Sequence, residues 1–344
     1  MERNLLTRYL LRRLLSSAIT IAVMAVLVFF ASRVLPGDPA VIRAGNDATP
    51  ELIARIRAEH GLDLPLYEQF FHYVGGLLHG DLGTSVRTGN PVSADLLTFL
   101  PATLELSLLA FVVAVLIGVT VGTVAAARAG RWPDAVARGF TAVGGSMPSF
   151  WLALMAIFVL VYSLGLFPSP VGRLPLGTSA PPRHTGFLTI DALIAGDSAL
   201  ATSALAQLAL PALLLGTLSS IALARITRTA MIDALSASHT RAARGLNLGR
   251  RHILLQEGFR NALPTIITSM GFVAGHLIAG NIIVEQIFSW PGIGRYLSTA
   301  ISQSDLDVVQ GFVIVVGVSY VLINLVVDLL YVVSDPRIDL RRAG

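Results

Sequence analysis

The chain has 344 residues, of which 54% are hydrophobic and only 13% are charged, and its mean hydropathy is +0.71. This apolar content exceeds that of water-soluble proteins and excludes a soluble enzyme. All 25 basic residues are arginine and cysteine is absent, which excludes a P-loop ATPase, disulfides, thiolate metal sites and thiol nucleophiles.

Six apolar stretches are long enough to cross a bilayer as helices, which takes about 20 residues each. They cover residues 14–35, 102–127, 146–166, 205–225, 263–284 and 311–333. The first is longer than the core of a signal peptide, and no cleavage site stands out before Arg33, so we interpret it as a retained helix. The sequence therefore predicts an all-α integral membrane protein with six transmembrane helices.

The arginines predict the orientation, because positive residues near membrane ends stay on the cytoplasmic side. With the N-terminus inside, 17 arginines lie in cytoplasmic segments and 8 outside. Both termini are then cytoplasmic, and we expect a multi-pass protein of a prokaryotic cell membrane. The net charge of +4 does not indicate nucleic-acid binding, because the arginines are spread among apolar segments without a basic stripe.

Two external segments are longer than turns. Residues 36–100 are polar and show helical patterning in two places, around Ile53 and around Phe70, which predicts a small external helical subdomain. Residues 167–203 contain five prolines in their first half, which predicts an irregular loop there. The apolar run 188–195 predicts a short helix after that loop. We divide the chain into an N-terminal tail with the first helix (1–35), the external subdomain (36–100), a five-helix core (101–333) with a cytoplasmic loop at 226–262, and a C-terminal tail (334–344).

Small and polar residues inside the apolar stretches have two possible roles each. The GxxxG spacings Gly118/Gly122 and Gly271/Gly275 indicate either helix contacts or chance. Glu105 is interpreted as a carboxylate near the interface at a helix start, and His276 as a buried, hydrogen-bonded histidine rather than a pathway residue. Asp328 and Asn324 share a helix face, and tying two helices together is favoured over a polar path.

No catalytic motif is visible. Glu59-His60 lacks the second histidine of a zinc protease, no nucleophile-elbow GxSxG occurs, and the segment from Gly80 to Val86 lacks the lysine of a phosphate loop. No metal site is therefore predicted.

The cytoplasmic loop between Arg225 and Arg260 predicts a helical extension, a break and a short helix. Gly245, Asn247 and Gly249 can each adopt a positive φ at the break. We expect this loop to expose a small apolar surface bordered by arginines. Such a surface could bind either a pocket on a partner protein or a layer of anionic lipid headgroups.

Several blocks resemble one family, the permease subunits of binding-protein-dependent ABC importers, specifically the first permease of dipeptide, oligopeptide and nickel systems. The blocks are Leu35-Pro-Gly-Asp-Pro39, Gly61-Leu-Asp-Leu-Pro-Leu, Gly75-Gly-Leu-Leu-His-Gly-Asp-Leu-Gly-Thr-Ser85, Leu100-Pro-Ala-Thr-Leu-Glu-Leu, Met147-Pro-Ser-Phe-Trp151, Glu285-Gln-Ile-Phe-Ser-Trp-Pro-Gly-Ile-Gly294 and Asp328-Leu-Leu-Tyr through Asp335-Pro-Arg. They cover nearly the whole chain.

The resemblance implies the type I ABC importer permease fold and a cytoplasmic coupling helix against an ATPase. The family's Glu-Ala-Ala motif maps onto Arg241-Ala242-Ala243, with Asn247 in place of its glycine and Pro264 one residue early. The coupling residues implied are Arg241, Ala242, Ala243, Arg244, Gly245, Leu246, Asn247, Gly249 and Arg251. A segment with Trp290, Pro291, Gly292 and Ile293 is interpreted as an external helix that borders the gate.

The implied partners are a second, similar permease, two cytoplasmic ATPase subunits or domains, an extracytoplasmic substrate-binding protein and membrane lipid. This chain is expected to bind no cofactor, with ATP and magnesium held by the ATPases. Peptides are the preferred substrate, and alternating access is the expected mechanism. The alternative is a stand-alone secondary transporter or channel, for which Asp328, His276 and Glu285 are the only candidate ion-site residues.

Overall fold

A computed structural model describes residues 2–34, 38–45, 48–279 and 281–334. Within these ranges the chain is helical, with no strand and one isolated bridge between Thr84 and Pro91. The predicted tail at 335–344 lies outside the described residues. So do residues 35–37 of the Leu35–Pro39 block and the Asp335-Pro-Arg end of the last family block.

Among the described residues, five helical segments are long and apolar enough to cross a membrane. Four belong to single helices, which are α1 (Glu2–Val34), α5 (Val92–Ala127), α9 (Ser198–Ser236) and α15 (Leu306–Ser334). The fifth segment joins α11 (Arg250–His252), the π-helical η2 (Ile253–Phe259) and α12 (Arg260–Ala279). Each of these five segments corresponds to one predicted apolar stretch. The predicted ends of the first and fifth stretches, at residues 35 and 284, extend beyond α1 and α12. α9 spans 39 residues and is far longer than a bilayer requires.

The predicted third span, 146–166, contains a helical segment of only 15 residues, α7 (Ser149–Ala156) continued by the π-helical η1 (Ile157–Ser163). It is preceded by α6 (Trp132–Ser146), and the two form a pair that is bent by 102°. The break falls at Met147 and Pro148, because the residue before a proline disfavours the helical conformation. Most of the connection between the second and third predicted spans is α6, and the turn before it is limited to residues 128–131. A sixth span exists if the bent pair counts as one.

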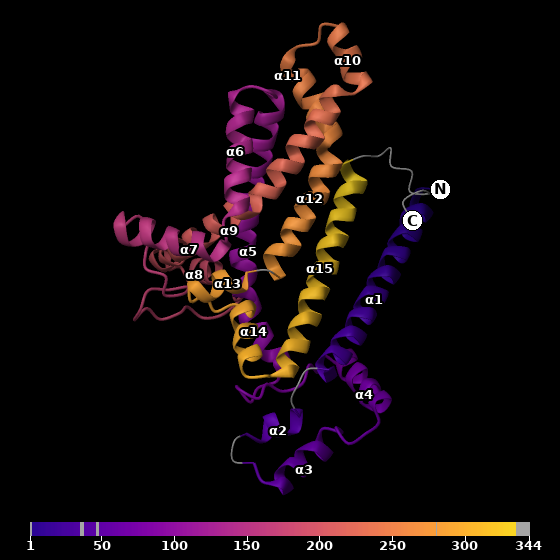
Figure 1. Cartoon of the computed structure of the whole chain (residues 1–344), viewed down its shortest axis with the longest axis vertical. Helices are drawn as coiled ribbons and strands as arrows, with labels where there is room; N and C mark the ends of the chain where they lie inside the picture. The colour runs from indigo at the N-terminus through magenta and orange to yellow at the C-terminus, as the bar shows by residue number, and fades with distance from the viewer. Residues whose placement is uncertain (1, 35–37, 46–47, 280, 335–344) are drawn as a thin grey trace.

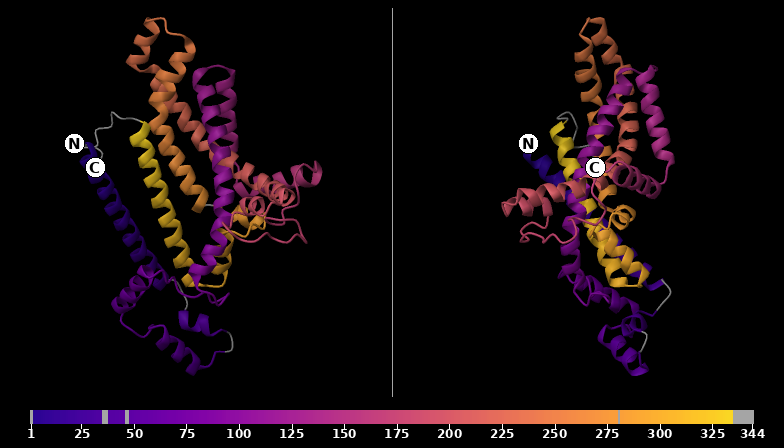
Figure 2. Two further views of the ribbon diagram at one scale, coloured as in Figure 1. Left: turned by 180° about the vertical axis from the view of Figure 1, so that it is seen from behind. Right: turned by 90° about the vertical axis from the view of Figure 1, so that its left-hand side faces the viewer.

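Figure 1 shows α1, α5, α9, α12 and α15 running lengthwise through an elongated molecule. One end carries α10 (Ser238–Gly245) and α11, and we call it the α10 end. The opposite end carries α2 (Pro39–Ala44), α3 (Pro50–Glu59) and α4 (Leu66–Leu78). α1 begins and α15 ends toward the α10 end, as the reverse view in Figure 2 also shows.

Close helix packing explains the two glycine pairs. A β-carbon on Gly118 or Gly122 would collide with α9, at Leu223 and Thr227. On α12, a β-carbon on Gly271 or Gly275 would collide with α15, at Val327 and Tyr320. Both pairs therefore lie where the backbones approach closely, which is how small residues contribute to packing in membranes.

The segment 36–100 is docked onto the start of α15. Asp305 is buried and accepts hydrogen bonds of 2.8 Å from Ser85 Oγ and from the Val86 amide. Asp307 forms an ion pair with Arg43. The division drawn at residue 100 lies inside α5, which begins at Val92 and contains Pro101.

Polar side chains join α1 to α15. Arg13 forms an ion pair with Asp328, and Gln310 Nε2 donates a 2.6 Å hydrogen bond to Ser32 Oγ. Asn324 donates to the carbonyl of Tyr320 in its own helix. Asp328 thus ties two helices together.

Candidate functional site

The loop at the α10 end is built from short helices that continue the long ones. α9 extends to Ser236, α10 follows after Ala237, and the chain returns through α11 and η2 into α12. The turn between α10 and α11 is made at Asn247, whose φ is +54°, whereas Gly245 is helical and Gly249 has a φ of −58°. Asparagine is the residue that best replaces glycine in this conformation. The substitution of the family's glycine therefore preserves the bend.

The inner face of this loop packs against the long helices. Ala243 is buried, and Thr240 Oγ1 donates a 2.8 Å hydrogen bond to the carbonyl of Ala234. η2 lies so close to α9 that a β-carbon on Gly258 would collide with Leu235. A displacement of α10 must therefore move the ends of α9 and α12.

The outer face of the loop carries an exposed leucine among arginines. Leu246 is 76% exposed, and Arg241, Ala242, Arg244, Gly245 and Arg251 are exposed around it. Arg250 Nη2 donates a 3.2 Å hydrogen bond to the carbonyl of Ala127 at the end of α5. An exposed large apolar side chain on a rigid support, rimmed by cations, is a suitable anchor for a protein partner.

The segment 290–293 lies near the other end and is turned inward. Trp290 is 1% exposed, and its Nε1 donates a 2.8 Å hydrogen bond to the carbonyl of Ala102. Ile293 is also buried, and it begins α14 (Ile293–Ser302), which follows α13 (Ile282–Ile287). The tryptophan and isoleucine thus fix α14 against α5 and present no outer surface.

Glu285 stabilises the turn between α13 and α14. Its carboxylate accepts hydrogen bonds from Thr103 Oγ1 at 2.6 Å and from the amide of Arg295 at 2.9 Å, and a β-carbon on Gly292 would collide with it. Burial raises the pKa of the Glu285 carboxyl above its ordinary value, and the hydrogen bonds work in the opposite direction. Glu285 is fully buried and fully engaged, which argues against the ion site that a secondary transporter would need.

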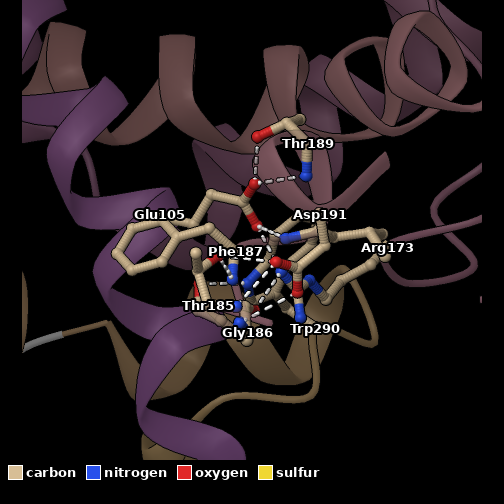
Figure 3. A network of polar contacts seen from close by, with 10 residues as sticks. Glu105, Arg173, Thr185, Gly186, Phe187, Thr189, Asp191 and Trp290 are labelled. Carbon is tan, nitrogen blue, oxygen red and sulfur yellow. Dashed lines mark hydrogen bonds and ion pairs between the residues drawn. The ribbon is translucent and has the colours of Figure 1, made fainter. Parts of the chain in front are cut away.

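A second polar network fastens the proline-rich segment 167–187 to α5 (Figure 3). Glu105 forms an ion pair with Arg173 and accepts a 2.9 Å hydrogen bond from the amide of Thr189 at the start of α8 (Leu188–Ile194). Asp191 accepts hydrogen bonds from the amides of Thr185 and Gly186 at 2.7 and 2.9 Å.

The interpretation of Glu105 as a carboxylate at a helix start is wrong. It lies 13 residues after the first residue of α5 and is 6% exposed. Its partner Arg173 is 68 positions away in an irregular loop, so no local pattern indicated the pair.

The interpretation of His276 as a buried, hydrogen-bonded histidine is also wrong. Its side chain is exposed and has no hydrogen-bond partner in the described part of the chain. It lines an open cavity of about 480 Å³ between the α6–α7 bend, α9 and α12. Helical periodicity places His276 on a face of α12 but cannot show whether a neighbouring helix covers that face.

The described residues contain no cluster of three or more histidine, aspartate or glutamate side chains able to hold a metal ion. The features of the site are instead mechanical and electrostatic. They are a loop with an anchoring leucine at one end, hydrogen-bonded turns near the other end, and between them a mainly apolar cavity that His276 and Arg225 line.

Comparison with known proteins agrees with this description. Residues 118–340 match the family of binding-protein-dependent transport system inner membrane components, and residues 6–107 match the N-terminal part of the membrane components of such systems. The probable D,D-dipeptide transport system permease protein DdpB of Escherichia coli (strain K12) is 42% identical over 93% of this chain and 94% of its own length. The dipeptide transport system permease protein DppB of the same strain is 39% identical over 96% and 98%.

These matches extend over almost the whole length of the relatives and include the loop, the bent pair and the turn at Glu285. They do not favour a stand-alone secondary transporter or channel. The chain belongs to the family of inner-membrane components of binding-protein-dependent transport systems, and it is a multi-pass permease subunit of an ABC importer.

Proposed function

We propose that this permease imports peptides and forms one half of the translocation pathway, with a second, similar permease forming the other half. Two relatives whose length it matches almost completely are named as dipeptide or D,D-dipeptide transport permeases. A substrate-binding protein delivers the peptide to the end that carries α3. ATP and magnesium are bound by two ATPase subunits or domains and not by this chain.

The α10 end is cytoplasmic in this proposal. It holds the loop with its arginines, and positive residues near membrane ends favour the cytoplasm. The start of α1 and the end of α15 lie toward the same end, so both termini are cytoplasmic.

The observation that carries the proposal is the exposed Leu246, which lies in the short turn between α10 and α11, in a loop whose helices lead from α9 to α12. ATPase closure pushes on the surface around Leu246, and the rigid loop passes the displacement to both helices. The cavity beside α9 and α12 then opens alternately to the two sides.

Copurification tests the proposed subunit composition of the importer. The permease, expressed with its neighbouring genes and captured through a tag, is expected to bring down a second permease and ATPase subunits in a fixed ratio. Proteoliposomes of that complex, supplied with the binding protein, are expected to accumulate a labelled dipeptide only when ATP is present. Accumulation by this chain alone, without nucleotide, would contradict the proposal.

A further inference from the structure

Two cavities meet at Arg225. The first is the 480 Å³ cavity that His276 lines, and it reaches from Asn281 to Arg225. The second, of about 540 Å³, lies further toward the α10 end between α9 and α12, and Arg225 lines it as well. Arg225 therefore stands at the point where a solute would pass from one cavity to the other.

The guanidinium of Arg225 is available to a ligand. The side chain is exposed and has no hydrogen-bond or ion-pair partner among the described residues. A β-carbon on Gly145 would lie 3.7 Å from Arg225 Nη2, which places the guanidinium against the end of α6, beside the bend. Three residues further along α9, by contrast, Arg228 is held by Asp134.

Among the residues that the structure describes, none that lines the first cavity is acidic. Its polar side chains are Ser149, Ser219, Arg225, His276 and Asn281, and the remainder are apolar or glycine. In the second cavity the acidic residue is Asp233, eight residues along α9 and so about 12 Å further along the helix axis. A cation without a counter-charge, at the edge of an apolar segment, favours an anionic partner.

We propose that Arg225 binds the free carboxylate of the cargo as it passes between the two cavities, while the apolar wall of α9 and α12 accommodates its side chains. The inference rests on the proposed function, because it assumes that peptides pass along this face of the permease. Guanidinium binds a carboxylate through two parallel hydrogen bonds, which gives directional recognition of a peptide C-terminus.

The test uses the complete importer in proteoliposomes, with its binding protein outside and ATP inside. ATP-driven uptake of labelled dialanine is measured for the wild type, Arg225→Lys and Arg225→Gln. Lysine keeps the charge and glutamine removes it. We expect Arg225→Gln to lower uptake by about tenfold or more, because the charge and both hydrogen bonds are lost. Arg225→Lys should lower it less, because lysine keeps the charge but not the two parallel hydrogen bonds. Arg131→Gln is the matched control, because Arg131 is exposed, lines neither cavity and, like Arg225, has no side-chain partner among the described residues.

The amount of assembled complex and its ATPase activity with loaded binding protein show whether each variant is folded and coupled. Since Arg225 has no partner in the described part of the chain, both quantities are expected to stay within about twofold of the wild type. Equal uptake by Arg225→Lys and Arg225→Gln would overturn the inference, whether both are active or both inactive. Where the wild type also transports dialanine amide, Arg225→Gln should leave its uptake nearly unchanged. A wild-type importer that takes up no dipeptide contradicts the proposed function instead.

Discussion

Asp134 on α6 and Arg228 on α9 form a two-point ion pair. Arg228 Nε donates to Asp134 Oδ1 at 2.6 Å and Nη2 donates to Oδ2 at 3.0 Å. The amide of Gly130 also donates to Asp134, which is 1% exposed. The pair therefore fixes the turn between α5 and α6 to the part of α9 that leads into α10.

Breaking this pair should loosen the support of the loop. In Asp134→Asn the half-buried Arg228 loses its counter-charge, and we expect the free energy of unfolding to fall by about 3 kcal/mol. Thermal unfolding in detergent measures the change. The double variant Asp134→Asn/Arg228→Gln removes the uncompensated cation and should recover part of the loss, whereas strictly additive effects would show that the two residues do not interact.

Leu246 and Ala243 should respond differently to the same substitution. Leu246→Glu places a charge on an exposed position, so the permease should fold normally but retain less ATPase on purification and lose roughly tenfold or more of its uptake. Ala243→Glu forces a charge into the buried inner face of α10 and should reduce the amount of folded protein.

Leu176→Glu is the control for Leu246→Glu. Leu176 is 86% exposed and lies in the irregular segment 167–187, away from the loop. The Leu176→Glu variant should retain the ATPase on purification and take up dipeptide as the wild type does. Loss of uptake in Leu176→Glu equal to that in Leu246→Glu would show that any exposed charge disturbs the permease, and the anchor role of Leu246 would fail.

Much of the fold is predictable because apolar length is a local property of the sequence. The long apolar runs in α1, α5, α9, α12 and α15 each contain enough consecutive residues to indicate a crossing, whatever their partners. The bend of 102° at Pro148 was less predictable, because a proline inside an apolar run indicates a kink but not its size. The apolar run 146–166 suggested a complete span, whereas its helical part is limited to the 15 residues of α7 and η1.

The site was less predictable, because its residues are paired across long distances in the sequence. Glu105 and Arg173 come from a helix and an irregular loop, and the cavity at Arg225 is formed where α6 bends away from α9. A cation such as Arg225 that ends an apolar run counts as a topology signal when only the sequence is known. Its exposure to two cavities depends on the packing of three helices.

Asp191 should make the segment 167–187 sensitive to acid. Burial acts to raise the pKa of the Asp191 carboxyl, but the hydrogen bonds from Thr185 and Gly186 outweigh it and hold that pKa below its ordinary value. A depressed carboxyl pKa contributes stability that is complete above the unfolded pKa, near 3.9, and is lost as the pH falls toward the folded value. Amide exchange of Thr185 and Gly186, corrected for intrinsic rates, should therefore show less protection below about pH 4.

Asp191→Asn should abolish this pH dependence. The amide side chain does not titrate, and it presents a donor to one of the two backbone amides, so protection should be lower by ~1–2 kcal/mol already at neutral pH. A pH profile in the variant that matches the wild type would assign the acid sensitivity to another carboxyl group.

The turn at Gly292 should tolerate no added carbon. A β-carbon there would meet the carboxylate of Glu285 and the hydroxyl of Thr103, which are already bonded to each other. Gly292→Ala must displace one of them, and since φ is −102° the cost comes from crowding rather than from the backbone. We expect a loss of about 1–3 kcal/mol in the free energy of unfolding. Gly139→Ala on α6 meets no atom within 4 Å and should be neutral or slightly stabilising, because alanine favours the helix. If the two variants unfold at the same temperature in detergent, the contact between α5 and the turn before α14 is looser than the hydrogen bonds at Thr103 indicate.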